Sequence, residues 1–98
     1  MHYSVVIISN NPYNYSNTYN LNVKVTLLDD CNLRLDDLHI SFDYLIYTDI
    51  SLVENQKEIG ILTEHKIPIT NYDKQTSVEN IYYCDECMIK DVLEIIFS

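Results

Sequence analysis

A strict alternation of apolar and polar residues constrains the fold of this chain more than any other feature. From Leu21 to Leu27, leucine and valine occupy every second position, and asparagine, lysine and threonine lie between them. Successive side chains of a β-strand point to opposite faces, so this period of two predicts a strand with one buried and one wet face. The same period runs from His39 to Thr48, which we expect to be the longest strand.

Other segments predict further strands. Tyr3–Ser9 is a short apolar run rich in β-branched residues, typical of a buried strand, and Val78–Cys84 reads in the same way. Residues 50–53 and 58–64 predict two strands joined by a turn, and Pro68 restricts its surroundings to a sheet edge or a turn. The sequence contains no alanine, the best helix former, and one glycine, which agrees with a chain dominated by strands.

The C-terminal segment has a different period. Ile89, Val92, Leu93 and Ile96 recur at the spacing of one helix face, which predicts a helix from about residue 86, with Asp85 as a cap. A strand is the alternative there, because β-branched residues are frequent. The 98 residues suit one domain, 1–98. We therefore predict an α+β fold of five to six mainly antiparallel strands, in a sheet or small sandwich, with one C-terminal helix; an all-β sandwich is the alternative.

The charge of the chain indicates what it binds. The formal net charge is -9, and the stretch from Asp29 to Glu54 carries acids against a single arginine, Arg34. Such a chain repels nucleic acid and anionic membranes and attracts basic protein surfaces. The acids that we expect to contact a partner are Asp29, Asp30, Asp36, Asp37, Asp43 and Asp49. Neither a signal peptide nor a long apolar span is recognised in the sequence, which predicts a protein of the cytoplasm, of a cell or of an infected host, without a membrane role.

An uncharged loop between the first two predicted strands offers a second binding feature. Tyr13, Tyr15 and Tyr19 lie there among asparagine and serine residues. Tyrosine combines a large contact area with a polar tip, and this composition is typical of binding loops. We nominate these tyrosines as apolar anchors for a partner; the alternative is that their rings fold back over the sheet.

Cys84 and Cys87 form a C-x-x-C pair that permits three interpretations. Redox catalysis is disfavoured, because the two residues between the cysteines are acids and nearby negative charge raises a thiol pKa. Zinc needs four ligands, which Cys31 and either His39 or His65 would complete, but no second ligand pair is present in the sequence. We predict ordinary core thiols and no metal or other cofactor, with a small zinc-binding domain as the alternative.

Catalytic patterns are missing from the sequence. The three histidines are scattered, no nucleophile-elbow motif occurs, and one glycine cannot make a glycine-rich phosphate loop. We therefore expect a non-enzymatic acidic binding protein, monomeric or homodimeric, that inhibits or occludes a basic, nucleic-acid-handling protein. Inhibitors from phages or mobile elements and immunity proteins are of this physical type. A self-assembling structural protein, of the kind found in virions, is the alternative.

Overall fold

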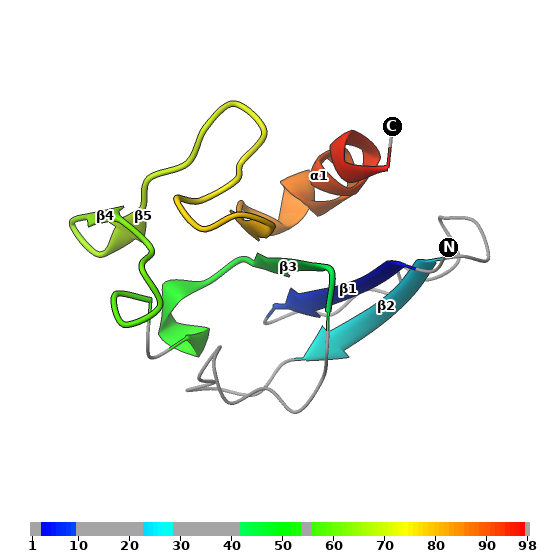
Figure 1. The fold of residues 1–98 in the computed structure, drawn as a ribbon, viewed down its shortest axis with the longest axis horizontal. Coiled ribbons are helices and arrows are strands. Elements are labelled where there is room, and N and C mark those ends of the chain that lie inside the picture. Colours follow the sequence, from blue (N-terminus) through cyan, green and yellow to red (C-terminus); the bar gives the residue numbers. More distant parts are fainter. Residues whose placement is uncertain (1–2, 10–22, 29–41, 54–55, 98) are drawn as a thin grey trace.

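Four parallel strands form the main sheet of the protein. The computed structural model describes residues 3–9, 23–28, 42–53 and 56–97. The strands are β1 (Tyr3–Ile8), β2 (Val23–Leu28), β3 (Tyr44–Tyr47) and β6 (Ile81–Tyr83), in the order β2-β1-β3-β6. All three pairings are parallel, and β1 lies between β2 and β3 (Figure 1). Each of the four predicted segments thus contains a strand, but the segment expected to be the longest is not: β3 has four residues, whereas β1 and β2 have six each.

The parallel arrangement corrects the prediction of a mainly antiparallel sheet. A sheet covered on both faces needs strands that are apolar on both faces, and parallel sheets are of this kind. Val5, Val6, Ile7 and Ile8 of β1 are all fully buried, as are Leu45, Ile46 and Tyr47 of β3. The segments that join β1 to β2 and β2 to β3 are also longer than the roughly dozen residues that a parallel crossover needs.

The two faces of the sheet build two separate apolar clusters. On one face Val5, Ile7 and Ile46 pack with Ile89 and Leu93 of the C-terminal helix. The opposite face carries a second cluster, which consists of Val6, Ile8, Leu45, Tyr47, Val53, Ile61 and Ile81. The sheet is therefore the central layer, and its second face is covered by the segment that follows β3.

The C-terminal helix confirms the helical interpretation of the last segment and excludes the all-β sandwich. A 3-10 turn, η4 (Glu86–Met88), leads into α1 (Ile89–Ile96), which lies along one face of the sheet (Figure 1). Ile89, Val92 and Leu93 are its buried residues, as the spacing predicts. Asp85 occupies the cap position before η4, but its side chain makes no capping hydrogen bond. The α+β class with one C-terminal helix is thus confirmed.

The pair of strands predicted at residues 50–53 and 58–64 is wrong for most of its length. Ile50–Leu52 forms a 3-10 turn, η3, because the Asp49 carboxylate accepts hydrogen bonds from the Ser51 amide at 2.9 Å and the Ser51 hydroxyl at 2.8 Å. A side chain that bonds nearby backbone in this way competes with strand pairing. Residues 56–60 form a turn as well.

Regular extended structure resumes only in a short hairpin. Here β4 (Thr63–Glu64) pairs antiparallel with β5 (Ile67–Pro68), at the end of the molecule far from the N-terminus (Figure 1). Pro68 therefore lies in a two-stranded ribbon, in agreement with the predicted edge position. No helix within the described ranges has the length and apolar character to cross a membrane.

Candidate functional site

The strand order identifies one edge of the sheet as a place where a ligand or partner can be met. All four strands are parallel, so their carboxyl ends share one edge. The chain leaves β1 towards β2 on one side and leaves β3 towards β6 on the other. In sheets of this kind, ligands bind outside the carboxyl ends of the strands where the connections diverge. The residues that follow β1, β3 and β6 are therefore the candidates.

A partly buried hydrogen bond closes part of this edge. Ser9 follows β1 directly and is fully buried. Its hydroxyl donates to Oε1 of Glu86 at 2.6 Å, which joins the end of β1 to the start of η4. The amide of Thr48, after β3, donates to the carbonyl oxygen of Ile8 at 3.1 Å. These bonds fix the ends of β1 and β3 relative to the C-terminal segment.

The negative charges of two carboxylates act on a tyrosine at the same edge. Tyr83 ends β6 and is half-buried, and its ring meets that of Tyr47 edge-on at 5.1 Å between centroids. The pKa of Tyr83 is raised above its usual value, first by burial and then by the negative charges of Asp49 and Asp85. Both carboxylates thus oppose ionisation of the Tyr83 hydroxyl. Asp85 is exposed, whereas Asp49 is half-buried and caps η3.

These charges determine which ligand the edge accepts. A phosphate-binding edge offers a glycine-rich loop and a helix N-terminus free of acids. Here Glu86 lies in η4, Asp91 lies in the first turn of α1, and the one glycine, Gly60, belongs to a distant turn. Acids at these positions oppose an anionic ligand and favour a cationic group.

The acidic stretch predicted to bind a partner does not gather on one surface where the structure describes it. Asp43 lies at the amino ends of the strands, where its Oδ2 accepts from the Ser4 amide at 2.8 Å and its own amide donates to the Ser4 carbonyl at 2.8 Å. Asp49 lies at the carboxyl ends. The other predicted contact residues, Asp29, Asp30, Asp36, Asp37, Tyr13, Tyr15 and Tyr19, lie outside the described residues.

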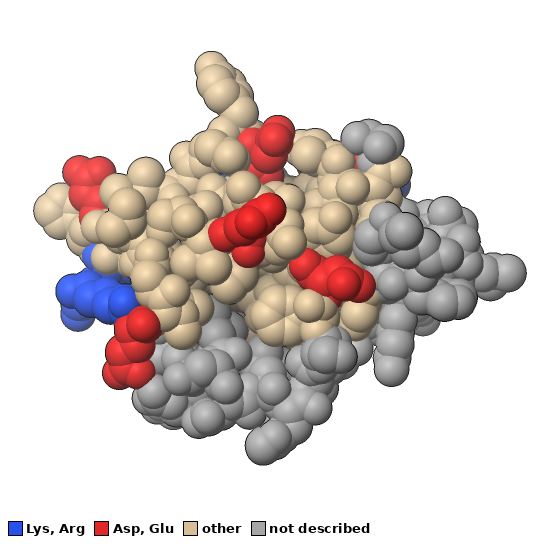
Figure 2. Space-filling view, in the orientation of Figure 1, with Lys and Arg blue, Asp and Glu red and all other residues tan. Residues whose placement is uncertain are grey.

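The wider distribution of charge agrees with this. Figure 2 shows acidic side chains as separate spots over the described surface, whereas a lysine or arginine side chain is visible near the end that carries the β4–β5 hairpin. Charge on this face is therefore distributed over several elements. A partner that contacts one region of this face would therefore meet only a few of the acidic side chains.

The cysteines of the C-x-x-C pair occupy different environments. Cys84 is 4% exposed and packs in the cluster beneath α1, and burial, with a contribution from Asp85, raises its pKa to about 12. Cys87 is exposed. A buried, protonated thiol is unsuited to nucleophilic chemistry. The core-thiol interpretation thus holds for Cys84 and is wrong for Cys87.

Only some of the proposed zinc ligands lie within the described residues. Cys31 and His39 lie outside the described residues, and His65 is exposed in the turn between β4 and β5. Within the ranges that the structure describes, no three histidine, cysteine or acidic side chains are grouped so as to hold a metal ion.

Sequence reasoning missed Asp85 and Glu86 as members of the acidic edge. Their position directly after a predicted strand was the available signal, but only a parallel sheet brings that position beside the end of β3. No family model, curated protein or solved structure matches this chain.

Proposed function

We propose that the protein is a non-enzymatic binding protein that occludes a basic surface of a nucleic-acid-handling protein in the cytoplasm. The observation that carries this proposal is the pair of carboxylates, Asp49 and Asp85, whose negative charges both act on Tyr83 at the carboxyl edge of the sheet. An arginine or lysine side chain of the partner would pair with these carboxylates. Its charge would also be attracted to the face of the tyrosine ring.

The site is suited to a rigid contact. The contact with Tyr47 fixes the ring of Tyr83, so little side-chain freedom is lost when a partner binds. Beside Tyr83 is a hollow of about 170 Å³ that Asp85 and Met88 also line. Lys74 lines the same hollow, so we expect a basic group of the partner to approach from the side of Asp49.

Net charge would act over a longer range than these contacts. A chain with a formal charge of -9 attracts a basic partner before contact and raises the association rate at low ionic strength. Charge alone gives weak and unselective attraction, so selectivity would rest on Tyr83 and on groups near it.

The test compares two charge reversals at exposed sites. Asp85→Lys reverses the charge beside Tyr83, and Glu94→Lys makes the same change on the outer side of α1, away from the edge. A partner captured from a lysate by the unaltered protein is purified, and association rates are measured at several salt concentrations. We expect Asp85→Lys to slow association at least fivefold at low salt, and Glu94→Lys to change it less than twofold.

An equal effect of both reversals would show that only net charge matters, and no effect of Asp85→Lys would exclude the edge as the contact. Asp36→Lys combined with Asp37→Lys, assayed in parallel, measures the contribution of the acidic stretch that lies outside the described residues.

Self-assembly is a second candidate function, supported by exposed apolar side chains near the hairpin. Leu62, Ile67 and Ile69 are each more than half exposed, and Tyr72 is fully exposed. Size-exclusion chromatography distinguishes the two functions, because assembly gives an elution volume that depends on protein concentration and a binding protein gives a fixed one.

A further inference from the structure

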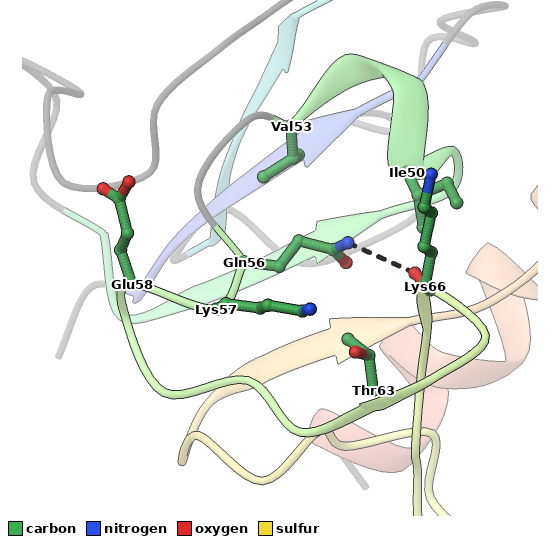
Figure 3. A pocket seen from close by; sticks show the side chains of 7 residues that line it. All are labelled: Ile50, Val53, Gln56, Lys57, Glu58, Thr63 and Lys66. Carbon is green, nitrogen blue, oxygen red and sulfur yellow. Dashed lines mark hydrogen bonds between the residues drawn. The ribbon is translucent and has the colours of Figure 1, made fainter.

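A hollow of about 430 Å³ lies between η3, the turn at residues 56–60 and the β4–β5 hairpin. Its walls include Ile50, Val53, Gln56, Lys57, Thr63 and Lys66 (Figure 3). Sites for small molecules are commonly of this size, with an apolar lining and a few polar groups. The hollow shares η3, which Asp49 caps, with the acidic edge, but neither Tyr83 nor Asp85 is among its described lining residues.

The position of the hairpin wall is fixed from within the core. The hydroxyl of fully buried Tyr47 donates to Oε1 of Gln56 at 2.8 Å. Nε2 of the same amide donates to the backbone carbonyl oxygen of Lys66 at 3.3 Å, the bond drawn in Figure 3. The Gln56 side chain therefore connects the core to the hairpin turn and places the backbone of Lys66 at the rim of the hollow.

The turn itself has an unusual sequence for its geometry. His65 and Lys66 have φ values of 51° and 70°, the left-handed region that a two-residue hairpin turn requires at both positions. Asparagine and glycine are the residues that adopt this conformation with least strain, whereas other side chains there cost about 1–2 kcal/mol each. The chain thus has a lysine at a position where backbone preference alone selects glycine.

The charge of the hollow is opposite to that of the protein. Lys57 and Lys66 both line it, and neither ammonium group forms an ion pair with any residue in the described ranges. Figure 3 shows Lys57 extending across the hollow beneath Gln56 and Lys66 extending towards Ile50. Glu58, the one acid among the described residues of the lining, points away from both lysines in the same view and has an interaction of its own.

We propose that this hollow binds a small phosphate monoester. Two ammonium groups match the two negative charges that such a phosphate carries near pH 7, and lysine is a common phosphate ligand. The hydroxyl of Thr63 offers a hydrogen bond, and the side chains of Ile50 and Val53, the latter 5% exposed, provide an apolar surface for the organic part. The negative net charge of the protein opposes an anion at long range, so we expect affinity on the order of millimolar.

Phenyl phosphate is the probe for the test, with phenol and inorganic phosphate as the two comparison ligands. Amide chemical shifts of the full chain are followed by NMR during titration at constant ionic strength. We expect saturable shifts around residues 50–53, 56–58 and 63–66 with phenyl phosphate. Phenol, which has no charge, should not saturate, and inorganic phosphate, which has no apolar part, should bind at least threefold more weakly.

Three variants test whether Lys57 and Lys66 are the groups that bind phenyl phosphate. Lys57→Gln and Lys66→Gln should each weaken phenyl phosphate binding about three- to fivefold, the effect of losing one partly exposed charge contact. Lys74→Gln is the matched control, because Lys74 also has a positive φ, 68°, but lines a different hollow. It should change the affinity less than twofold, and thermal melting of each variant checks that the fold is retained.

The proposal is overturned by phenyl phosphate shifts that do not saturate below about 50 mM, by equal weakening in Lys74→Gln, or by equal binding of inorganic phosphate. The outcome is independent of the partner-binding proposal, because Asp85→Lys leaves the lining of this hollow intact.

Discussion

The hydroxyl group of Tyr47 is the polar tip of a side chain that the core otherwise encloses. Its hydrogen bond to Gln56 supplies the partner that a buried hydroxyl requires, and no buried side-chain polar atom in the described ranges lacks a partner. Because Gln56 also holds the turn at Lys66, the bond connects packing in the centre with the shape of a surface hollow.

Removal of this hydroxyl should lower stability by a small, measurable amount. Tyr47→Phe keeps the ring in place but leaves Oε1 of Gln56 without the Tyr47 donor, and we expect the free energy of unfolding to fall by about 1 kcal/mol. Urea denaturation measures this change. Tyr72→Phe, at a fully exposed ring, is the control and should stay within about 0.5 kcal/mol of the unaltered protein. Equal stability of Tyr47→Phe and the unaltered protein would show that the hydrogen bond is replaced by water.

At the scale of elements, α1 covers one face of the sheet through a short stripe of side chains. The helix has eight residues, too few to be stable alone in water, so its packing on β1 and β3 must stabilise it. The buried residues Val5 and Ile7 belong to the same cluster, so their burial depends in part on this contact.

Truncation of one residue in this stripe should show how much the contact contributes. Leu93 is fully buried, and Leu93→Ala should lower the free energy of unfolding by roughly 2–5 kcal/mol, from lost burial and the cavity that remains. Glu94→Ala, at the next and exposed position, should change it by less than about 0.5 kcal/mol. A loss below 1 kcal/mol in Leu93→Ala would mean that α1 is not firmly packed. Thermal or urea unfolding followed by circular dichroism gives both values.

The strands of the main sheet and α1 could be located from the sequence, but their arrangement could not be predicted. Periods of two and 3.6 are local signals, so the main strands and α1 were found. The direction of pairing is not part of these periods; only the apolar character of both faces of Val5–Ile8 indicated a parallel sheet. The acidic edge was missed because it depends on that direction, and the lysine hollow was missed because a turn, not a strand, forms its wall at residues 56–60.

At the scale of the whole molecule, buried proton donors make stability depend on alkaline pH. Burial raises the pKa of Cys84 from 9.0 to about 12, and it also raises that of Tyr47 above its ordinary value of 10.0. The unfolded chain releases these protons at the ordinary values, while the folded chain retains them. The protonated Cys84 thiol therefore makes its full contribution to the free energy of unfolding below pH 9, and this contribution is lost as the pH rises towards 12.

We expect the free energy of unfolding to fall between pH 9 and pH 10.5 by up to about 1.4 kcal/mol per pH unit for this thiol. Cys84→Val removes the titrating group with little change in volume and should flatten the dependence. Cys87→Ser, which replaces an exposed thiol, should leave it unaltered. Urea unfolding in the presence of a phosphine reductant measures the three profiles. If the slope is the same in all three proteins, the cause lies in other groups.

The parallel order of the strands also has a consequence for the time course of folding. None of the four strands of the main sheet can pair with its neighbour through a tight hairpin. Pairing of β3 with β1 closes a loop that contains the whole of β2. Loop closure reduces chain entropy before any long-range contact compensates, so chains with such distant pairings fold slowly for their size. Until β6 and α1 arrive, Val5 and Ile7 lack the apolar cover that these two described elements provide, and the exposed strand of an incomplete chain can associate with other chains. A chaperone that holds nascent chains would therefore be expected to engage this protein until its last segment has emerged.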